Sequence, residues 1–452
     1  MKKNLFRKSI FLILLLIVLA FTGCSRETGV VFDPDIVYVP EFTEKIVLTL
    51  ASFAPHHFDP AVAEFNRTNT SYKIELVDIQ RDYGAWPDGI DKMILEIIAG
   101  SGPDMVHPYQ LHQFPQWVKQ GLFEDLYDFI DTDHVLDRSD FLDSILRGFE
   151  TDGKLYQMAP GVSIRTIIGH PDIVGSDSGW DINEFITVIE SNPQAILPLG
   201  SSVGGIGTIS LLLNNNIKSF IDWETGTVSF DNDHFIKLLE FSYSVESGFK
   251  QSNVGVSENA PLRRITAGEQ IMERVHYSRL EEYSAFQVLF GGDFIFKGFP
   301  TDTGSGNTIE TIYGLAMTTV SEHKDGAWEF FRMYLSEDWQ RQTLSNRNYL
   351  VQYLPTNRII FEEKLAGAMV EFVNPYVYWG DLTTTAKPLT YEDIKIIRNL
   401  VNSVSYTPAQ LDDPLNYLIM EVMLDFLADR ITAQDAARII QNRASTYVSE
   451  QN

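Results

Sequence analysis

The sequence has almost no cysteine, no apolar run long enough to cross a membrane, and too little positive charge to balance its acids. Its 452 residues contain one cysteine, Cys24, which excludes a disulfide within the chain and a metal site built from several thiolates. The 35 Lys and Arg residues stand against 61 Asp and Glu, and the formal net charge is −26 at pH 7. Such a surface repels nucleic acid, and no basic stripe offsets it, so we expect no nucleic-acid partner. The chain also lacks a G-x-x-x-x-G-K-[ST] phosphate loop and is therefore not itself an ATPase of that type.

The N-terminal segment has the layout of an export signal. Basic residues at positions 2, 3, 7 and 8 precede an apolar run over 10–21, which is shorter than the roughly 20 residues that a membrane-spanning helix needs. Residues 20–24 (AFTGC) resemble a bacterial lipobox, in which the cysteine is lipidated and becomes the new N-terminus. We expect a signal peptide at 1–23 and a lipid-anchored tether at 24–44. An ordinary secretory signal with an incidental cysteine is the alternative, and both place the protein outside the cell.

Strand and helix patterns alternate after the tether. Residues 46–50 (IVLTL) predict a strand covered on both faces, and 72–76 alternate like a second strand. Apolar residues at helical spacing over 90–98 predict a helix that ends at Gly100. A short third strand follows at 104–106, where we expect Asp104 to have a structural role. This order predicts an α/β fold with parallel pairing.

The rest of the chain continues the alternation and is too long for one lobe. Single cores stop growing near about 250 residues, so two lobes are expected. The local signals are helix caps and strand segments. They predict a helix N-cap at Asp59, a capping pair Asp181 with Glu184, a strand at 195–199, a turn at 222–226 between two short strands, and a capping pair Thr432 with Asp435.

Several segments together resemble the extracellular solute-binding proteins (family 1) that serve carbohydrate ABC transporters. In chain order they are 97–106 (IIAGSGPDMV), 121–126 (GLFEDL), 152–156 (DGKLY), 220–226 (FIDWETG), 298–301 (GFPT), 325–330 (DGAWEF), 354–357 (LPTN) and 436–443 (AARIIQNR). The last segment is typical of members from low-GC Gram-positive bacteria. One stretch departs from the pattern: many members have an aromatic residue and an Asn-Lys pair just after the hinge, where this chain has 165–170 (RTIIGH). No known sugar specificity therefore carries over.

The resemblance implies a two-lobed α/β fold of the periplasmic-binding-protein type II, each lobe a mostly parallel sheet flanked by helices. A hinge crossed several times joins the lobes. We expect the N-terminal lobe at 45–160 and 308–350, and the C-terminal lobe at 161–307 and 351–452. The implied function is capture of a carbohydrate, chiefly an oligosaccharide, in the cleft between lobes and its delivery to ABC permease subunits. The resemblance implies a monomer without cofactor, metal or catalysis, held at the outer face of the cell membrane only by its lipid.

Loops that follow the predicted strands supply the candidate ligand-binding residues. Ligands of open α/β sheets bind at the carboxyl ends of strands, and sugars need aromatic faces and polar groups. The candidates are Phe53, Tyr109, Gln110, Ser163, Arg165, Ser201, His276, Tyr277, Tyr378 and Trp379. Tyr109 and Trp379 rank first, because bulky aromatics beside Gly, Pro or Asp in loops are less often core. For each residue the alternative is an ordinary loop side chain or surface packing.

Other chemistry has weaker support in the sequence. Residues 200–204 (GSSVG) match the G-x-S-x-G nucleophile elbow, but no downstream histidine has a recognisable triad context. His56 and His57 with Asp59 suggest a metal site that lacks an identifiable third ligand. A surface enzyme acting on polysaccharide, a binding protein for a non-sugar solute and a sensory adaptor remain as alternatives.

Overall fold

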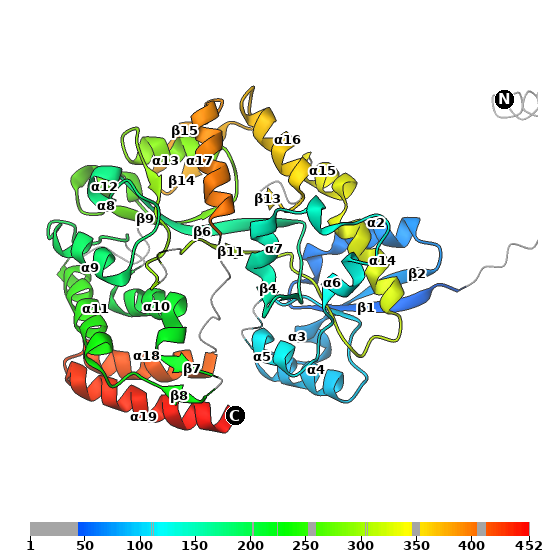
Figure 1. The fold of residues 1–452 in the computed structure, drawn as a ribbon, viewed down its shortest axis with the longest axis horizontal. Coiled ribbons are helices and arrows are strands. Elements are labelled where there is room, and N and C mark those ends of the chain that lie inside the picture. The colour runs from blue at the N-terminus through cyan, green and yellow to red at the C-terminus, as the bar shows by residue number, and fades with distance from the viewer. Residues whose placement is uncertain are drawn as a thin grey trace, which may run out of the picture. The chain divides into compact units, whose positions relative to one another are not determined.

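Two separate β-sheets organise the protein (Figure 1). The computed structural model describes residues 44–451 except 110, 112, 201–202, 224, 252–258, 303, 305, 346–352 and 405–412. Residues 45–452 form one unit, distinct from 1–44. The expected signal peptide, nearly all of the tether and the expected lipidation site Cys24 lie outside the described residues.

The first sheet confirms the three strands predicted near the start of the ordered chain. Its order is β12-β3-β1-β2, and β1 pairs in parallel with both β2 and β3, while β12 is antiparallel to β3. The strands are β1 (Ile46–Ser52), β2 (Tyr72–Asp78), β3 (Met105–Val106) and β12 (Ala316–Met317). Asp104 accepts hydrogen bonds from the backbone N–H of Thr49 (2.8 Å) and from the Ser321 hydroxyl (2.6 Å). Its expected structural role is confirmed, since it ties the approach to β3 to its neighbours.

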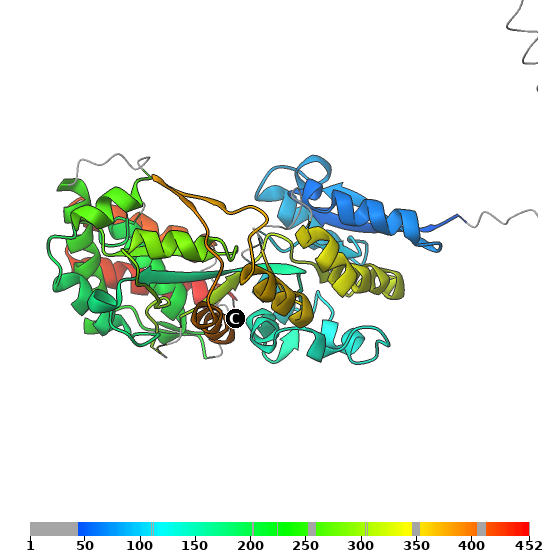
Figure 2. The ribbon, with the colours of Figure 1, turned by 90° about the horizontal axis from the view of Figure 1, so that it is seen from above.

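Both faces of the first sheet are covered, as its apolar strands require. Leu50 and Ala51 are both fully buried yet belong to different core clusters, because successive strand residues point to opposite faces. Figures 1 and 2 show α14 beside β1 and β2 on one side. The flanking helices are α2 (Asp59–Thr68) and α14 (Lys324–Leu335) on that side, and α3 (Ile79–Asp82), α4 (Asp88–Ile98) and α5 (Phe114–Lys119) on the other.

One predicted helix start is wrong by one residue. Phe58 occupies the N-cap of α2, and no side chain caps the helix. Asp59 and Pro60 are its first two helical residues, where a carboxylate and a proline both suit the helix N-terminus. The helix itself and its buried face, which includes Val62 and Phe65, are as predicted.

The second sheet is built around one long strand, β6 (Gly161–Gly169). Every described partner of β6 is antiparallel, so the expectation of a mostly parallel sheet holds for the first sheet and is wrong for the second. The partners are β9 (Met272–Tyr277), β10 (Ile295–Phe296), β11 (Thr308–Glu310) and β13 (Leu354–Pro355). The chain enters the second sheet along β6 and leaves it along β11 toward β12, and two segments that run in opposite directions pair antiparallel.

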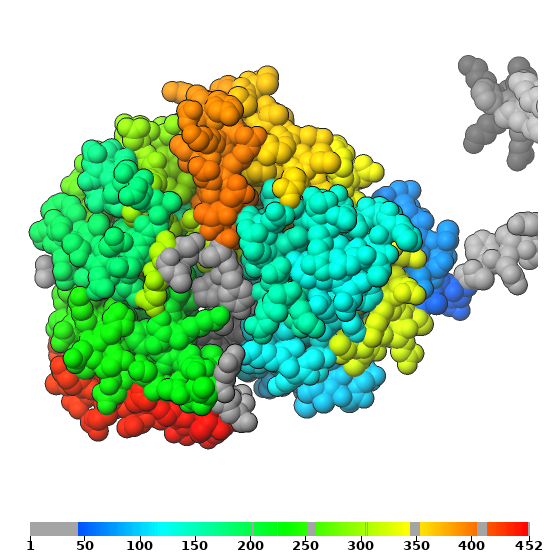
Figure 3. All heavy atoms as spheres, viewed as in Figure 1, coloured from blue at the N-terminus to red at the C-terminus, as the bar shows by residue number. Residues whose placement is uncertain are grey.

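A helical layer forms a second core against one face of this sheet. The Asp181–Glu184 capping box and the Thr432–Asp435 pair are confirmed at two of its helices. Figure 3 shows the surfaces of α11 and α19 in contact along one edge of the molecule. The helices of this layer are α9 (Ile182–Glu190), α10 (Gly205–Asn216), α11 (Asp233–Gln251), α18 (Asp413–Leu427) and α19 (Ala433–Gln451).

The predicted strand at 195–199 is absent and turns replace it. The segment contains Pro198, which has no N–H for a ladder, and only isolated hydrogen bonds such as Met272 N–H to the Pro198 carbonyl (3.0 Å) tie it to β9. The predicted turn at 222–226 does join two short strands, β7 (Ile221–Asp222) and β8 (Thr227–Val228), which pair antiparallel.

The opposite face of the second sheet is covered by later parts of the chain (Figure 1). These are α13 (Glu282–Leu289), α16 (Arg358–Ala368), the hairpin β14 (Tyr376–Trp379) with β15 (Leu382–Thr385), and α17 (Tyr391–Asn402). The remaining elements are η1 (Pro55–His57), α6 (Leu126–Ile130), η2 (Arg138–Asp140), α7 (Asp143–Phe149), β4 (Glu150–Thr151), β5 (Lys154–Leu155), α8 (Pro171–Val174), η3 (Ile217–Ser219), α12 (Pro261–Ala267) and α15 (Glu337–Ser345). None of the helices in the described ranges is both long enough and apolar enough to cross a membrane.

Candidate functional site

The carboxyl ends of β1 and β3 carry a group of histidine and aromatic side chains. Ser52 ends β1, and its hydroxyl lies 2.8 Å from Nδ1 of His107, which directly follows β3. The His107 ring stacks on Tyr109, with ring centroids 5.6 Å apart, and lies 6.1 Å from the ring of His57. Burial lowers the pKa of His107 to about 3, with a smaller contribution from His57, so this imidazole is neutral at physiological pH.

Two tyrosines extend this group. The ring of Tyr313 lies 5.4 Å from that of His57 and 5.2 Å from that of Tyr353, which it meets edge to face. Gly161 makes room for Tyr353, because a Cβ at position 161 would lie only 2.8 Å from the Cβ of Tyr353. We call His57, His107, Tyr109, Tyr313 and Tyr353 the aromatic cluster.

A row of polar side chains occupies one face of the second sheet. Ser163 and Arg165 are two residues apart on β6 and therefore share a face. His276 of β9 lies opposite Arg165, and Glu310 of β11 lies opposite Ser163, so both point to the same side. Nδ1 of His276 lies 2.7 Å from Oε2 of Glu310. We call these four residues the polar strip.

The polar strip has a defined charge arrangement. The hydrogen bond from His276 lowers the pKa of Glu310 despite its burial, and the positive charge of Arg165 adds to this effect. Glu310 is therefore ionised and held by its neighbours. Tyr353 packs against Gly161, which lies two residues before Ser163 on β6 and so on the same face. The aromatic cluster and the polar strip therefore adjoin one another.

This arrangement suits a small polar ligand with apolar faces. Tyrosine rings offer flat surfaces and hydroxyl groups, while a guanidinium, a carboxylate and neutral imidazoles offer directed hydrogen bonds. Within the described part of the chain, no three His, Cys, Asp or Glu side chains come together as a metal site would require.

The structure brings four of the candidate ligand-binding residues together. Tyr109 belongs to the aromatic cluster, and Ser163, Arg165 and His276 belong to the polar strip. Phe53, just after β1, is partly buried and packs against the core cluster on the side of the first sheet covered by α3, α4 and α5. Gln110 and Ser201 lie outside the described residues.

The other three candidates lie elsewhere. Tyr277 is fully buried and points to the opposite face of the sheet from His276, where it packs on Phe286 at a ring-centroid distance of 6.0 Å. Trp379 packs on the same phenylalanine at 5.1 Å. Tyr378 is 70% exposed on β14. Tyr277 is therefore a core residue, because strand alternation turns it away from the polar strip.

Sequence reasoning missed His57, Tyr313, Tyr353 and Glu310 as members of the site. Glu310 belongs to a strand of three residues, and Tyr353 directly precedes a strand of two, too short for any periodic pattern. Their place in the chain could have indicated two of these residues. Tyr353 directly precedes the motif at 354–357 (LPTN), and Tyr313 follows β11.

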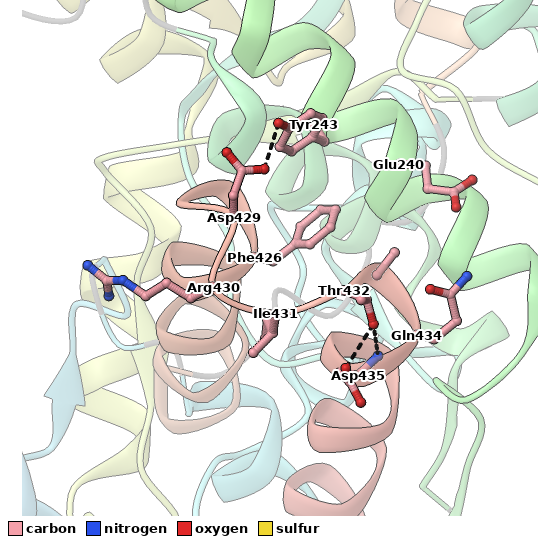
Figure 4. Close-up of a pocket in the computed structure, with 10 residues that line it drawn as sticks. Glu240, Tyr243, Phe426, Asp429, Arg430, Ile431, Thr432, Gln434 and Asp435 are labelled. Atoms are coloured by element: carbon pink, nitrogen blue, oxygen red, sulfur yellow. Dashed lines mark hydrogen bonds between the residues drawn. The ribbon is translucent and has the colours of Figure 1, made fainter.

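A separate hollow of about 610 Å³ lies between α11 and the α18–α19 turn (Figure 4). Four of its polar side chains pair with one another: the Tyr243 hydroxyl donates to Asp429 (2.7 Å), and the Thr432 hydroxyl donates to Asp435 (2.9 Å). Asp429 adopts a positive φ of 58° at the end of α18. These contacts describe a capped helix–turn–helix junction, so we do not regard this hollow as the candidate site.

Residues 61–228 match the family model of bacterial extracellular solute-binding proteins. The resemblance indicated by the sequence motifs is thereby confirmed. No curated protein matches the chain.

Solved structures with the same fold cover nearly the whole chain. The sugar-binding protein MalE from Xanthomonas citri has 13% sequence identity and a TM-score of 0.56, over 90% of this chain and 98% of that one. A periplasmic solute-binding protein from Pectobacterium atrosepticum has 16% identity and a TM-score of 0.55, over 90% and 99%. A cyclic alpha-maltosyl-1,6-maltose binding protein from Arthrobacter globiformis has 13% identity and a TM-score of 0.52, over 90% and 100%. At these identities the likeness shows the fold alone, and the expected two-lobed α/β class is confirmed.

Proposed function

We propose that this protein is an exported solute-binding protein that captures a carbohydrate and delivers it to an ABC transporter permease. The observation that carries the proposal is the meeting of the aromatic cluster with the polar strip. The first comes largely from the carboxyl ends of first-sheet strands, where ligands of α/β sheets bind, and the second comes from the second sheet. A sugar ring held there would stack on tyrosine and bond to Arg165, Glu310 and His276.

The proposed mechanism is closure of two lobes on the ligand. The proposed lobes are 45–160 with 308–350, and 161–307 with 351–452. A ligand that touches Tyr109 in the first and Arg165 in the second stabilises the closed state, which the permease then recognises. In support, the proposed lobe boundaries before residues 161 and 308 fall at the starts of β6 and β11, which pair antiparallel in the polar strip.

We propose binding without turnover. The three histidines downstream of the 200–204 motif have separate partners: His234 stacks on Phe220, His276 bonds Glu310, and His323 occupies the N-cap position of α14. The names of two structural neighbours support a sugar as the solute, since one is called sugar-binding and another is named for a maltosyl-maltose ligand. One further neighbour is described as a designed esterase, so the test below includes a check for turnover.

We further propose that Cys24 carries the lipid anchor and that the protein works as a monomer on the outer face of the cell membrane. Mass spectrometry of the protein from membranes should show loss of residues 1–23 and a lipid on Cys24. If Cys24 is unmodified and the protein is secreted, residues 1–23 are an ordinary export signal and the protein has no lipid at Cys24.

Thermal unfolding with a panel of mono- and oligosaccharides, polyols and amino acids tests the proposal. A ligand that binds only the folded protein adds about 2.7 kcal/mol of stability at 100 times its Kd, which shifts the midpoint visibly. We expect a sugar to raise the midpoint and to be recovered intact. Consumption of the sugar would favour the alternative of a polysaccharide-acting enzyme. A rise in the midpoint with amino acids alone would favour a binding protein for a non-sugar solute.

A further inference from the structure

The guanidinium of Arg165 contains one buried N–H group without a hydrogen-bond partner among the described residues. This is the Nε–H group, and no acceptor in the described part of the chain reaches it. The guanidinium carbon of Arg165 lies 5.8 Å from the centre of the Phe299 ring, which supports the side chain from one side. A buried guanidinium N–H without an acceptor is costly, and native structures rarely keep one without a purpose.

The nearby carboxylate does not fill this role. Glu310 lies on the same face but is held by His276 at 2.7 Å, and its interaction with Arg165 is one of charge at longer range. Arg274, two residues before His276 on β9, lies opposite Ile167 and so faces the same side of the sheet. Its pKa is lowered by burial and by the positive charge of Arg165.

Arg165 is thus a cation with an unsatisfied N–H in a chain whose net charge is −26. A neutral sugar offers this cation no opposite charge. A carboxylate on the ligand would accept two parallel hydrogen bonds from the guanidinium fork of Arg165.

We infer that the ligand is an acidic carbohydrate, whose carboxylate Arg165 binds while its sugar rings contact the aromatic cluster. This inference rests on the proposed function, because it names the class of carbohydrate that the same site takes. Uronic-acid oligosaccharides have this chemistry, with a carboxylate in place of the hydroxymethyl group of the neutral sugar.

Calorimetric titration with matched sugars tests the inference. The probes are galacturonate and glucuronate oligosaccharides, each paired with the neutral galactose or glucose oligosaccharide of equal length. We expect an acidic sugar to bind at least about tenfold more tightly than its neutral counterpart, as one hydrogen bond to a charged group implies. Raising the salt concentration should weaken the acidic sugar more than the neutral one.

Three variants locate the effect. Arg165→Gln should lose that preference, and Arg165→Lys should retain part of it, because lysine keeps the charge without the fork. Arg443→Gln removes the same charge from α19, where Arg443 pairs with Glu421 (2.7 Å), and should bind like the unaltered protein. If the Arg165 variants do not fold, the affinities of the unaltered protein for the matched acidic and neutral sugars still test whether the ligand is acidic.

The outcomes separate the two claims. Equal or tighter binding of the neutral sugars would overturn the acidic ligand and leave the carbohydrate-binding proposal standing. Failure of every sugar, acidic or neutral, would overturn both.

Discussion

The two faces of the second sheet use the same strands for opposite purposes. His276 and Tyr277 are adjacent in the sequence, yet His276 joins the polar strip while Tyr277 is fully buried against Phe286 of α13. Arg165 and Ile164 of β6 divide in the same way. An aromatic residue beside a polar one is therefore poor evidence of a binding role until the register of the strand is known.

The same contrast appears in two glutamates. Burial raises the pKa of Glu273, on the face shared with Tyr277, to about 7, although Gln270 and Trp379 hydrogen-bond it. The hydrogen bond from His276 lowers the pKa of Glu310 on the other face. Burial therefore destabilises the charge of Glu273, whereas the hydrogen bond from His276 stabilises the charge of Glu310.

The largest expected effect is the loss of Tyr277. Tyr277→Ala removes a fully buried ring that packs on Phe286 and Phe296, and should lower the free energy of unfolding by about 3–5 kcal/mol. His276→Ala, one residue away, should cost less than about 1 kcal/mol, since its side chain is more than half exposed. Denaturant unfolding of both variants measures the contrast, and similar losses would contradict the assignment of the two faces.

The second prediction concerns the contribution of the Tyr353 ring to ligand affinity. Tyr353→Ala should weaken ligand binding by roughly tenfold, because it removes an aromatic face of the cluster. Tyr378→Ala is the matched control, as Tyr378 is exposed on β14 and should leave affinity unchanged. Calorimetry against the best sugar from the thermal screen gives both values. A loss confined to Tyr378→Ala would move the site to the other face.

The pH dependence of stability should differ in sign between the two glutamates. The pKa of Glu273 is about 7 when folded and 4.5 ordinarily, so its contribution to stability is complete below pH 4.5 and is lost as the pH rises through 7. Glu273→Gln should remove this loss, which is about 3 kcal/mol. Urea unfolding at pH 5 and pH 8 measures it.

Glu310→Gln provides the opposite control. Its lowered pKa means that its contribution is present above pH 4.5 and disappears as the pH falls, so this variant should flatten the acid side of the stability profile instead. The same sign for both variants would contradict the contrast between the faces.

The smallest effect concerns the hydroxyl of Tyr277. This oxygen is buried and has no hydrogen-bond partner among the described residues. Tyr277→Phe should therefore leave stability within about 1 kcal/mol of the original or raise it, because an unpaired polar atom leaves the core. A clear loss in thermal unfolding would reveal a partner for this hydroxyl.

Much of the first sheet could be predicted from the sequence, and less of the second. The run at 46–50 and the stripe over 90–98 are long enough for a strand and a helix to be recognised, and parallel pairing follows from their order. By contrast, β10, β11 and β13 have two or three residues each, and the 195–199 segment is apolar without being a strand. A strand of two or three residues forms because a neighbouring strand pairs with it. That neighbour is distant in the sequence, so no local pattern predicts the pairing.

The sequence by itself determined the acidic character of the chain, its two-lobed α/β class and the loop in which Tyr109 lies. These depend on composition, periodicity and the order of motifs, which are local properties. The expected loop at Ser163 and Arg165 is wrong, because both residues belong to strand β6. Only the tertiary structure decided that Tyr313, Tyr353 and Glu310 join them and that Tyr277 does not. Register fixes which face a strand residue occupies, and pairing between distant segments fixes register.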